Sequence, residues 1–276
     1  MKIVFAFIGT NKYLDFFPKY YEGIEKYFIP EAEKTFLVFT DGEIDDTPDN
    51  VKVYHQEHLE WPYITLKRFE IINKARKEIE KNDWFVFLDA DTRVVSEITK
   101  EDFTLRCCGG NEENIPFFGV HHPCHYLWMP PHNELPGAWD QTPESEAFVD
   151  FDTIEAYKVD SMKRGYTIFR GGEKYNRQLT YYQGCFWGGK VPAVCAMIDE
   201  LEARTNRDLE KGVIAKWHDE SHLNKYFIEN EFKLHTFGPE YAYPEVFTQQ
   251  CESHTYFRRT PTKIVHLAKD NSAYQI

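Results

Sequence analysis

Short apolar runs alternate with helical patterns along the first 120 residues of the chain. The runs KIVFAFI, TFLVFT, VKVYH and WFVFL are typical of buried strands. Between them, apolar residues recur three or four positions apart over 13–27 and 69–79, which predicts helices. Strands and helices in alternation predict an α/β fold of the Rossmann-like, doubly wound kind, with a mostly parallel central sheet and helices on both faces.

The second half of the chain is less regular. It holds an aromatic and glycine-rich block, YYQGCFWGG, and a helical pattern over 192–204. Residues from about 109 to 179 show no regular pattern and are interpreted as a long loop that is either mobile or covers a substrate. Because no repeat, low-complexity tract or linker divides the sequence, we expect one domain over 1–276, with halves at 1–120 and 121–276.

Composition excludes several classes of protein. The 276 residues are 42% apolar, enough for a real core, and 32 basic against 45 acidic residues leave a net charge of −13. That charge disfavours nucleic acid and anionic membranes as partners. No apolar run is long enough for a membrane anchor or a signal core. Six cysteines without a framework-like spacing indicate reduced thiols, so we expect a cytoplasmic enzyme.

Two carboxylates follow the run WFVFL, at Asp89 and Asp91. Ligands of parallel sheets bind at the carboxyl ends of strands, where two acids can share a hard cation such as Mg²⁺ or Mn²⁺ with the phosphates of a substrate. A pair of this kind can also simply cap a turn. Since the sequence has neither a dinucleotide fingerprint nor a P-loop, phosphate binding would depend on a metal and on basic residues, with Arg68 and Lys269 as candidates.

The segment WHDESHLNKY, residues 217–226, has few apolar side chains for a helix that only packs. Trp217, Leu223 and Tyr226 are the main candidates for burial, so the remaining polar side chains are interpreted as the wall of a binding site. His218 and His222 lie four residues apart, but the order between them differs from that of HExxH zinc sites. A second metal site is therefore not predicted.

Taken in order, several blocks resemble glycosyltransferase family 6, the retaining α-1,3-galactosyl- and N-acetylgalactosaminyltransferases that include the ABO blood-group transferases. These blocks are FAFIGTNKY, FTDGE, WPYITLKRFEII, FLDADTRV, FGVHHP, YYQGCFWGG, WHDESHLNKY and GPEY. The resemblance covers nearly the whole chain. It implies a GT-A fold, a UDP-sugar donor bound mainly by the first half, and an acceptor sugar bound by the second.

The resemblance also implies roles for individual residues. Asp89 and Asp91 correspond to the family's DXD motif, which binds Mn²⁺, with Mg²⁺ as the alternative. Glu220 corresponds to the catalytic carboxylate, and it would contact the acceptor together with His122 and Trp217. The implied donor-binding residues are Phe5, Ala6, Tyr13, Trp61, Arg68, Asp89, Gln183, Gly184, Cys185, His218, Asp219 and Lys269.

Several points stay open at the level of sequence. Gln183 and Cys185 match neither well-known pair of sugar-selecting residues, and the bulk of Cys185 favours galactose over N-acetylgalactosamine. Both aspartates are kept where several bacterial relatives have asparagines, so we expect metal dependence. The start of the chain at the catalytic domain is typical of the family's soluble bacterial or phage members, and the tail lacks the family's terminal arginine.

Glu220 could attack the anomeric carbon or stabilise a cationic transition state. The family suggests a neutral, in some members fucosylated, oligosaccharide acceptor. Three alternatives to galactosyl transfer remain: transfer of N-acetylgalactosamine, hydrolysis of the UDP-sugar, and carbohydrate binding without catalysis.

Overall fold

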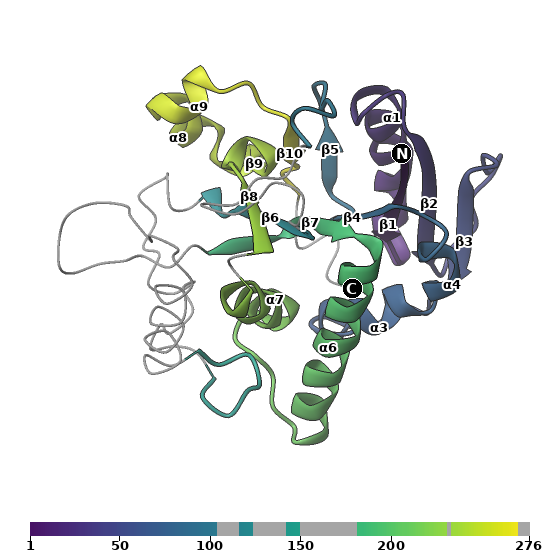
Figure 1. The fold of residues 1–276 in the computed structure, drawn as a ribbon, viewed down its shortest axis with the longest axis vertical. Coiled ribbons are helices and arrows are strands. Elements are labelled where there is room, and N and C mark those ends of the chain that lie inside the picture. The colour runs from purple at the N-terminus through teal and green to yellow at the C-terminus, as the bar shows by residue number, and fades with distance from the viewer. Residues whose placement is uncertain (104–115, 124–141, 150–180, 231–232, 270–276) are drawn as a thin grey trace.

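A computed structural model describes residues 1–103, 116–123, 142–149, 181–230 and 233–269 (Figure 1). Its centre is a seven-stranded sheet of order β3-β2-β1-β4-β7-β6-β8. The strands are β1 (Lys2–Ile8), β2 (Glu33–Thr40), β3 (Val51–His55), β4 (Trp84–Leu88), β6 (Phe117–His121), β7 (Tyr182–Lys190) and β8 (Leu234–Phe237). β7 is antiparallel to both neighbours and the other pairs are parallel, so the expected mostly parallel α/β sheet is confirmed.

Helices cover both faces of this sheet. α1 (Phe17–Tyr27), entered through a 3-10 turn at Asn11–Phe16, packs on one face with Ile3, Phe5 and Phe7. α3 (Arg68–Asn73), α6 (Val191–Glu210) and α7 (His218–Glu229) pack on the other with Val4 and Ala6. The alternation of side chains along β1 thus separates two apolar cores. No helix in the described ranges is long and apolar enough to cross a membrane.

A second sheet of three short strands lies beside the first. β5 (Thr92–Val94), β10 (Ile264–His266) and β9 (Tyr243–Pro244) pair in the order β5-β10-β9. Because β5 directly follows β4, the tail of the chain is brought back to the segment that holds Asp89 and Asp91. Around β9 lie the short elements η6 (Pro239–Tyr241), η7 (Glu245–Phe247), α8 (Thr248–Ser253) and α9 (Thr255–Arg259).

Two local predictions were wrong. The helix expected over 69–79 is divided into α3 and α4 (Arg76–Ile79), because the amides of Lys74 and Ala75 bond three residues back and end α3. The short helix α2 (Tyr63–Leu66) precedes them. The block YYQGCFWGG, read as irregular, forms most of the inner strand β7, which lies between β4 and β6. A Cβ on its Gly188 would lie 2.1 Å from the carbonyl oxygen of Phe85, so glycine permits the approach of β4. Most of the loop expected over 109–179 lies outside the described residues.

Candidate active site at the strand ends

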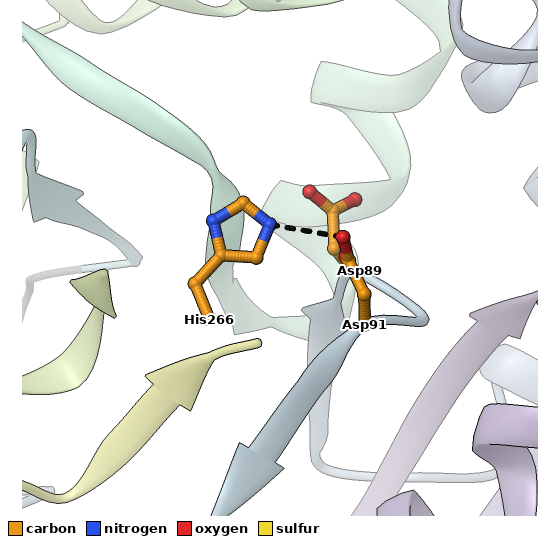
Figure 2. Close-up of side chains that lie close together, drawn as sticks. All are labelled: Asp89, Asp91 and His266. Carbon is orange, nitrogen blue, oxygen red and sulfur yellow. Dashed lines mark ion pairs between the residues drawn. The ribbon is translucent and has the colours of Figure 1, made fainter. Parts of the chain in front are cut away.

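The two acids predicted at the end of β4 do lie together at the edge of the sheet. The amide of Asp89 donates to the carbonyl of Cys185 on β7 at 3.0 Å, which fixes the turn after β4. Asp91 is buried, whereas the carboxylate of Asp89 remains partly exposed. Ligand atoms of Asp89, Asp91 and His266 all lie within 4.8 Å of one another, and Figure 2 shows the imidazole facing the two carboxylates.

Asp91 is flanked by two cationic or potentially cationic groups. His266 on β10 places Nε2 3.2 Å from Oδ2 of Asp91, and Nζ of Lys269 lies 2.5 Å from the same oxygen. Lys269 also donates to the hydroxyl of Tyr13 at 2.9 Å. Burial raises the pKa of the Asp91 carboxyl, but the charges of His266 and Lys269 outweigh burial and hold that pKa well below its usual range. Asp91 is therefore a carboxylate at neutral pH.

Arg68, at the start of α3, joins three parts of the site. Its guanidinium lies 2.9 Å from Oδ1 of Asp89 and 2.6 Å from Oδ2 of Asp219, and it donates to the carbonyl of Gly184 at 3.2 Å. The group is buried and lies over the ring of Phe87, 4.4 Å from its centroid. This planar fork therefore links the end of β4, strand β7 and the first turn of α7.

The first turn of α7 holds two carboxylates against β7. The amide of Gly184 donates to Oε2 of Glu220 at 2.6 Å, and the hydroxyl of Tyr181 donates to Oε1. Burial raises the pKa of Asp219 to about 6, although Arg68 acts in the opposite direction. Asn224, one turn further, accepts from the amide of Tyr182 and donates to its carbonyl, both at 2.8 Å. These bonds fix α7 relative to the strand.

The residues predicted to contact the acceptor lie around this turn. Just after β6, the amide of His122 donates to the carbonyl of Tyr181 at 2.9 Å. Because the hydroxyl of Tyr181 donates to Glu220, Tyr181 links His122 to this carboxylate. Trp217 directly precedes α7 and is partly exposed. Trp61 is 65% exposed, and its ring meets that of His218 edge to face with centroids 4.7 Å apart. Apolar surface thus adjoins the charged cluster.

Other predicted residues lie deeper in the protein. Phe5 and Ala6 are fully buried on β1, where the ring of Phe5 contacts Phe28 and Phe36. Cys185 is buried on β7, and burial together with Asp89 raises the pKa of its thiol well above the ordinary value. Gln183 approaches His266, with 3.1 Å between Nε2 and Nδ1. The uridine contact expected of Phe5 and Ala6 stays a prediction.

Three residues of the site were not predicted from the sequence: Tyr181, Asn224 and His266. Tyr181 and Asn224 stand inside blocks that were singled out, and only their partners on the facing element reveal their roles. His266 is the last residue of the short strand β10, much as Asp89 directly follows β4. A short apolar run that ends in a possible metal ligand was therefore the signal in the sequence that could have indicated it. Its pairing with β5 joins residues far apart in sequence.

The residues at the strand ends fit a divalent cation. Two carboxylates of different exposure and one imidazole offer oxygen and nitrogen ligands of the kind that Mn²⁺ and Mg²⁺ sites use. In the part of the chain that the structure describes, no other group of three such residues converges in this way. The carboxyl ends of β4 and β7, the start of α7 and the tail together form one polar site.

Comparisons with known proteins agree with this geometry. The family model described as Glycosyltransferase family 6 matches residues 173–261, which include β7, α7 and α9. The chain is 29% identical to the O-antigen biosynthesis glycosyltransferase WbnI of Escherichia coli over 255 residues, which make up 92% of this chain and 92% of that protein.

Mammalian proteins are more distant. Histo-blood group ABO system transferase 2 of Rattus norvegicus is 23% identical over 246 residues, 86% of this chain and 62% of that protein. Globoside alpha-1,3-N-acetylgalactosaminyltransferase 1 of Homo sapiens is 24% identical over 86% of this chain and 59% of that protein. The chain thus spans about three fifths of the length of these mammalian relatives.

Proposed function

Because this chain is a glycosyltransferase that matches the model of Glycosyltransferase family 6 over residues 173–261, we propose that it belongs to this family. We propose further that it transfers galactose from UDP-galactose to the 3-hydroxyl of an acceptor galactoside or oligosaccharide, with retention and in a Mn²⁺-dependent manner. The observation that carries the proposal is the position of Arg68. It contacts Asp89 of the acid pair and Asp219, the neighbour of Glu220. A diphosphate bound near Asp89 would therefore bring its sugar next to the Glu220 carboxylate.

Asp89 and Asp91 would hold the cation, and a bound Mn²⁺ supplies Lewis-acid stabilisation of the charge that develops on the departing diphosphate. Lys269 supports the same role from the chain itself. Its ammonium group, now against Asp91 and Tyr13, brings a positive charge to the place where phosphates would bind. Arg68 adds a third positive charge that also orients Asp89.

Glu220 is the proposed catalytic residue. Its two hydrogen bonds, from Gly184 and Tyr181, orient the carboxylate before any substrate arrives. A negative charge fixed at this point can stabilise an oxocarbenium-like transition state, and the same carboxylate can attack the anomeric carbon in a double displacement. A Cβ on Gly184 would lie 3.3 Å from Oε2 of Glu220, so glycine at this position preserves the contact.

The acceptor would bind on the other side of Glu220. Trp217 offers an apolar platform for a sugar ring, and His122 offers a hydrogen-bonding ring beside Tyr181. The net charge of −13 suits a neutral oligosaccharide, and we include fucosylated acceptors in the proposal.

Support for galactose comes from Cys185. Its thiol is buried, and by the resemblance to family 6 it corresponds to the position where a glycine would leave space for an N-acetyl group. The name of the human globoside relative refers to N-acetylgalactosamine, so transfer of that sugar is the second candidate.

The test is UDP release by the purified protein, supplied with UDP-galactose or UDP-N-acetylgalactosamine, with Mn²⁺ or a chelator, and with or without a fucosylated galactoside. Release that needs the metal and rises with acceptor supports the proposal and identifies the sugar. Release indifferent to every acceptor favours a UDP-sugar hydrolase, in which changes at His122 or Trp217 would have little effect. No release from either donor would contradict the proposed substrate and favour a carbohydrate-binding protein.

The metal claim has its own variant. Asp91→Asn should reduce turnover with Mn²⁺ to the level measured with chelator, because the cation loses a charged ligand. Asp45→Asn, which changes an exposed acid in the turn after β2, should leave turnover unchanged. Metal-stimulated turnover that survives in Asp91→Asn would refute this part of the proposal.

A further inference from the structure

We propose that His266 binds the divalent cation through Nε2 as a third protein ligand, that Gln183 positions its ring, and that the two residues make the site prefer Mn²⁺ to Mg²⁺. The inference rests on the proposed function, because it takes a cation at Asp89 and Asp91 as given. It assigns Gln183, which the resemblance to family 6 links to the choice of sugar, to the metal site as well.

The position of His266 is fixed by the backbone on both sides. It pairs with Thr92 in the antiparallel ladder of β10 and β5, and the amide of the next residue, Leu267, donates to the carbonyl of Asp91 at 2.8 Å. Figure 2 shows the ring directed at the carboxylates from the opposite strand. The backbone segments that carry His266 and Asp91 are therefore hydrogen-bonded to each other, which holds the imidazole beside the carboxylate.

The spacing of the ligand atoms suits a shared cation. Neighbouring ligands of an octahedral ion with bonds of ~2.1 Å lie about 3 Å apart. Nε2 of His266 is 3.2 Å from Oδ2 of Asp91, and the three candidate ligand atoms all lie within 4.8 Å of one another. Only small side-chain movements would be needed to place the three atoms around one ion.

Gln183 supplies what a metal-bound imidazole needs. When Nε2 binds a metal, the ring proton is on Nδ1, which then requires an acceptor. The amide of Gln183 lies 3.1 Å from Nδ1, at present through its nitrogen. Its oxygen Oε1 is buried and has no hydrogen-bond partner among the residues that the structure describes. Rotation of the amide by half a turn would pair this oxygen with the Nδ1 proton.

The nature of the ligands determines which metal is preferred. Carboxylates alone suit Mg²⁺, Ca²⁺ and Mn²⁺ alike, whereas an imidazole nitrogen suits transition metals better than Mg²⁺ or Ca²⁺. A site built from Asp89 and Asp91 alone would accept Mg²⁺ readily. Addition of His266 favours Mn²⁺, and the effect depends on the orientation that Gln183 gives the ring.

The first test measures binding of Mn²⁺ and of Mg²⁺ by calorimetry in the presence of UDP. His266→Gln should lower Mn²⁺ affinity at least about tenfold and Mg²⁺ affinity less, so the preference for Mn²⁺ falls. Gln183→Leu should lower Mn²⁺ affinity roughly 10- to 100-fold, as loss of an outer hydrogen-bond partner does in other metal sites. Gln183→Glu should keep the affinity, because its carboxylate accepts the same Nδ1 proton.

A matched control and a spectroscopic measurement complete the test. His55→Gln changes an exposed histidine on the edge strand β3 and should alter neither affinity. In wild-type protein with ¹⁵N-labelled histidines, pulsed EPR of bound Mn²⁺ with UDP should show coupling to a histidine nitrogen. This measurement does not depend on the folding of any variant.

The outcomes separate this inference from the proposed function. Mn²⁺ that binds and loses affinity in Asp91→Asn, but shows no histidine coupling, would refute the role of His266 and leave the metal-dependent transferase intact. An unchanged affinity in Gln183→Leu would refute the positioning role. Failure of the wild type to bind any Mn²⁺ with UDP would refute the metal claim of the proposed function, and this inference with it.

Discussion

Helix α7 presents buried polar residues on two faces, and their surroundings differ. Toward β7, Asp219 and Glu220 converge with Arg68 and the backbone of Gly184 at the strand ends. Toward α6, His222 places Nε2 3.5 Å from Oδ2 of Asp208. The carboxylate of Asp208 also accepts hydrogen bonds from the Ser145 hydroxyl at 2.5 Å and from the backbone amide of Glu146. The first face meets partly exposed ligand groups, whereas the second is enclosed.

The two faces also differ in charge. Burial raises the pKa of Asp219 to about 6 and lowers that of His222 to about 4, so both shifts favour the neutral form. At neutral pH Asp219 is nevertheless a carboxylate beside the Arg68 guanidinium, whereas His222 is uncharged. The polar character of WHDESHLNKY therefore has two origins. One face holds charge at the proposed active site, and the other joins α7 to α6 and to residues 145–146.

The largest expected effect is on the face toward β7. Glu220→Gln should lower kcat on the order of 10²- to 10³-fold, because a fixed charge is removed where positive charge develops. Donor affinity and the midpoint of thermal unfolding should change little, since the glutamine oxygen still accepts from the amide of Gly184 and its NH2 group can donate to the hydroxyl of Tyr181. Steady-state kinetics with both substrates, together with a thermal melt, checks the prediction.

Glu229→Gln is the matched control for this change. Glu229 ends the same helix and pairs with Arg204 of α6, away from the strand ends. This variant should keep kcat. If Glu220→Gln raised KM alone and left kcat intact, Glu220 would be a binding residue.

The next effect concerns stability on the face toward α6. The pKa of His222 is about 4 in the folded state, below its ordinary value of 6.5. Between pH 4 and pH 6.5 this imidazole is therefore protonated in the unfolded chain but not in the folded protein. Stability from this group is present above pH 6.5 and is lost as pH falls toward 4, by about 3 kcal/mol in total. Urea unfolding at pH 7, 5.5 and 4.5 should show a smaller acid loss in His222→Gln than in the wild type. An equal loss of unfolding free energy on acidification in the two proteins would contradict this prediction.

Asp219 should show the opposite dependence on pH. Its folded pKa of about 6 exceeds its ordinary value of 3.8. Its contribution to stability is therefore fully present below pH 3.8 and is lost as pH rises through about 6. In the same unfolding series Asp219→Asn should lose more stability on acidification than the wild type does. If Asp219→Asn instead lost less stability on acidification than the wild type, as His222→Gln should, the two faces would not differ in their dependence on pH.

Sequence alone predicted the class of fold and much of the site. The position of Asp89 and Asp91 after an apolar run follows from local pattern, because strand ends of a parallel sheet meet at one edge. The contribution of Arg68 was expected only in outline. Its contacts with both Asp89 and Asp219 depend on the packing of α3 against α7 and β7, which no local pattern records.

What the sequence did not predict depends on pairing across long separations. His266 reaches Asp91 because β10 pairs with β5, and β7 enters the sheet between β4 and β6 although its glycines are unusual in a strand. The two faces of α7 also look alike in sequence. His222 and Asp219 are both polar residues in one motif, and only their partners distinguish a structural contact from a site contact.

The smallest expected effect tests how strictly the two faces are separated. Nζ of Lys225 donates to the carbonyl of Glu146 at 2.8 Å, on the face toward residues 145–146. Lys225→Met keeps most of the apolar stem but removes this bond, so it should cost about 1 kcal/mol in urea unfolding. Turnover should be unchanged, because Asn224 still fixes the opposite face of α7 to the backbone of Tyr182. A fall in kcat beyond about twofold would mean that the contacts on the α6 side also set the position of Glu220, and the helix would then have to be treated as one coupled unit.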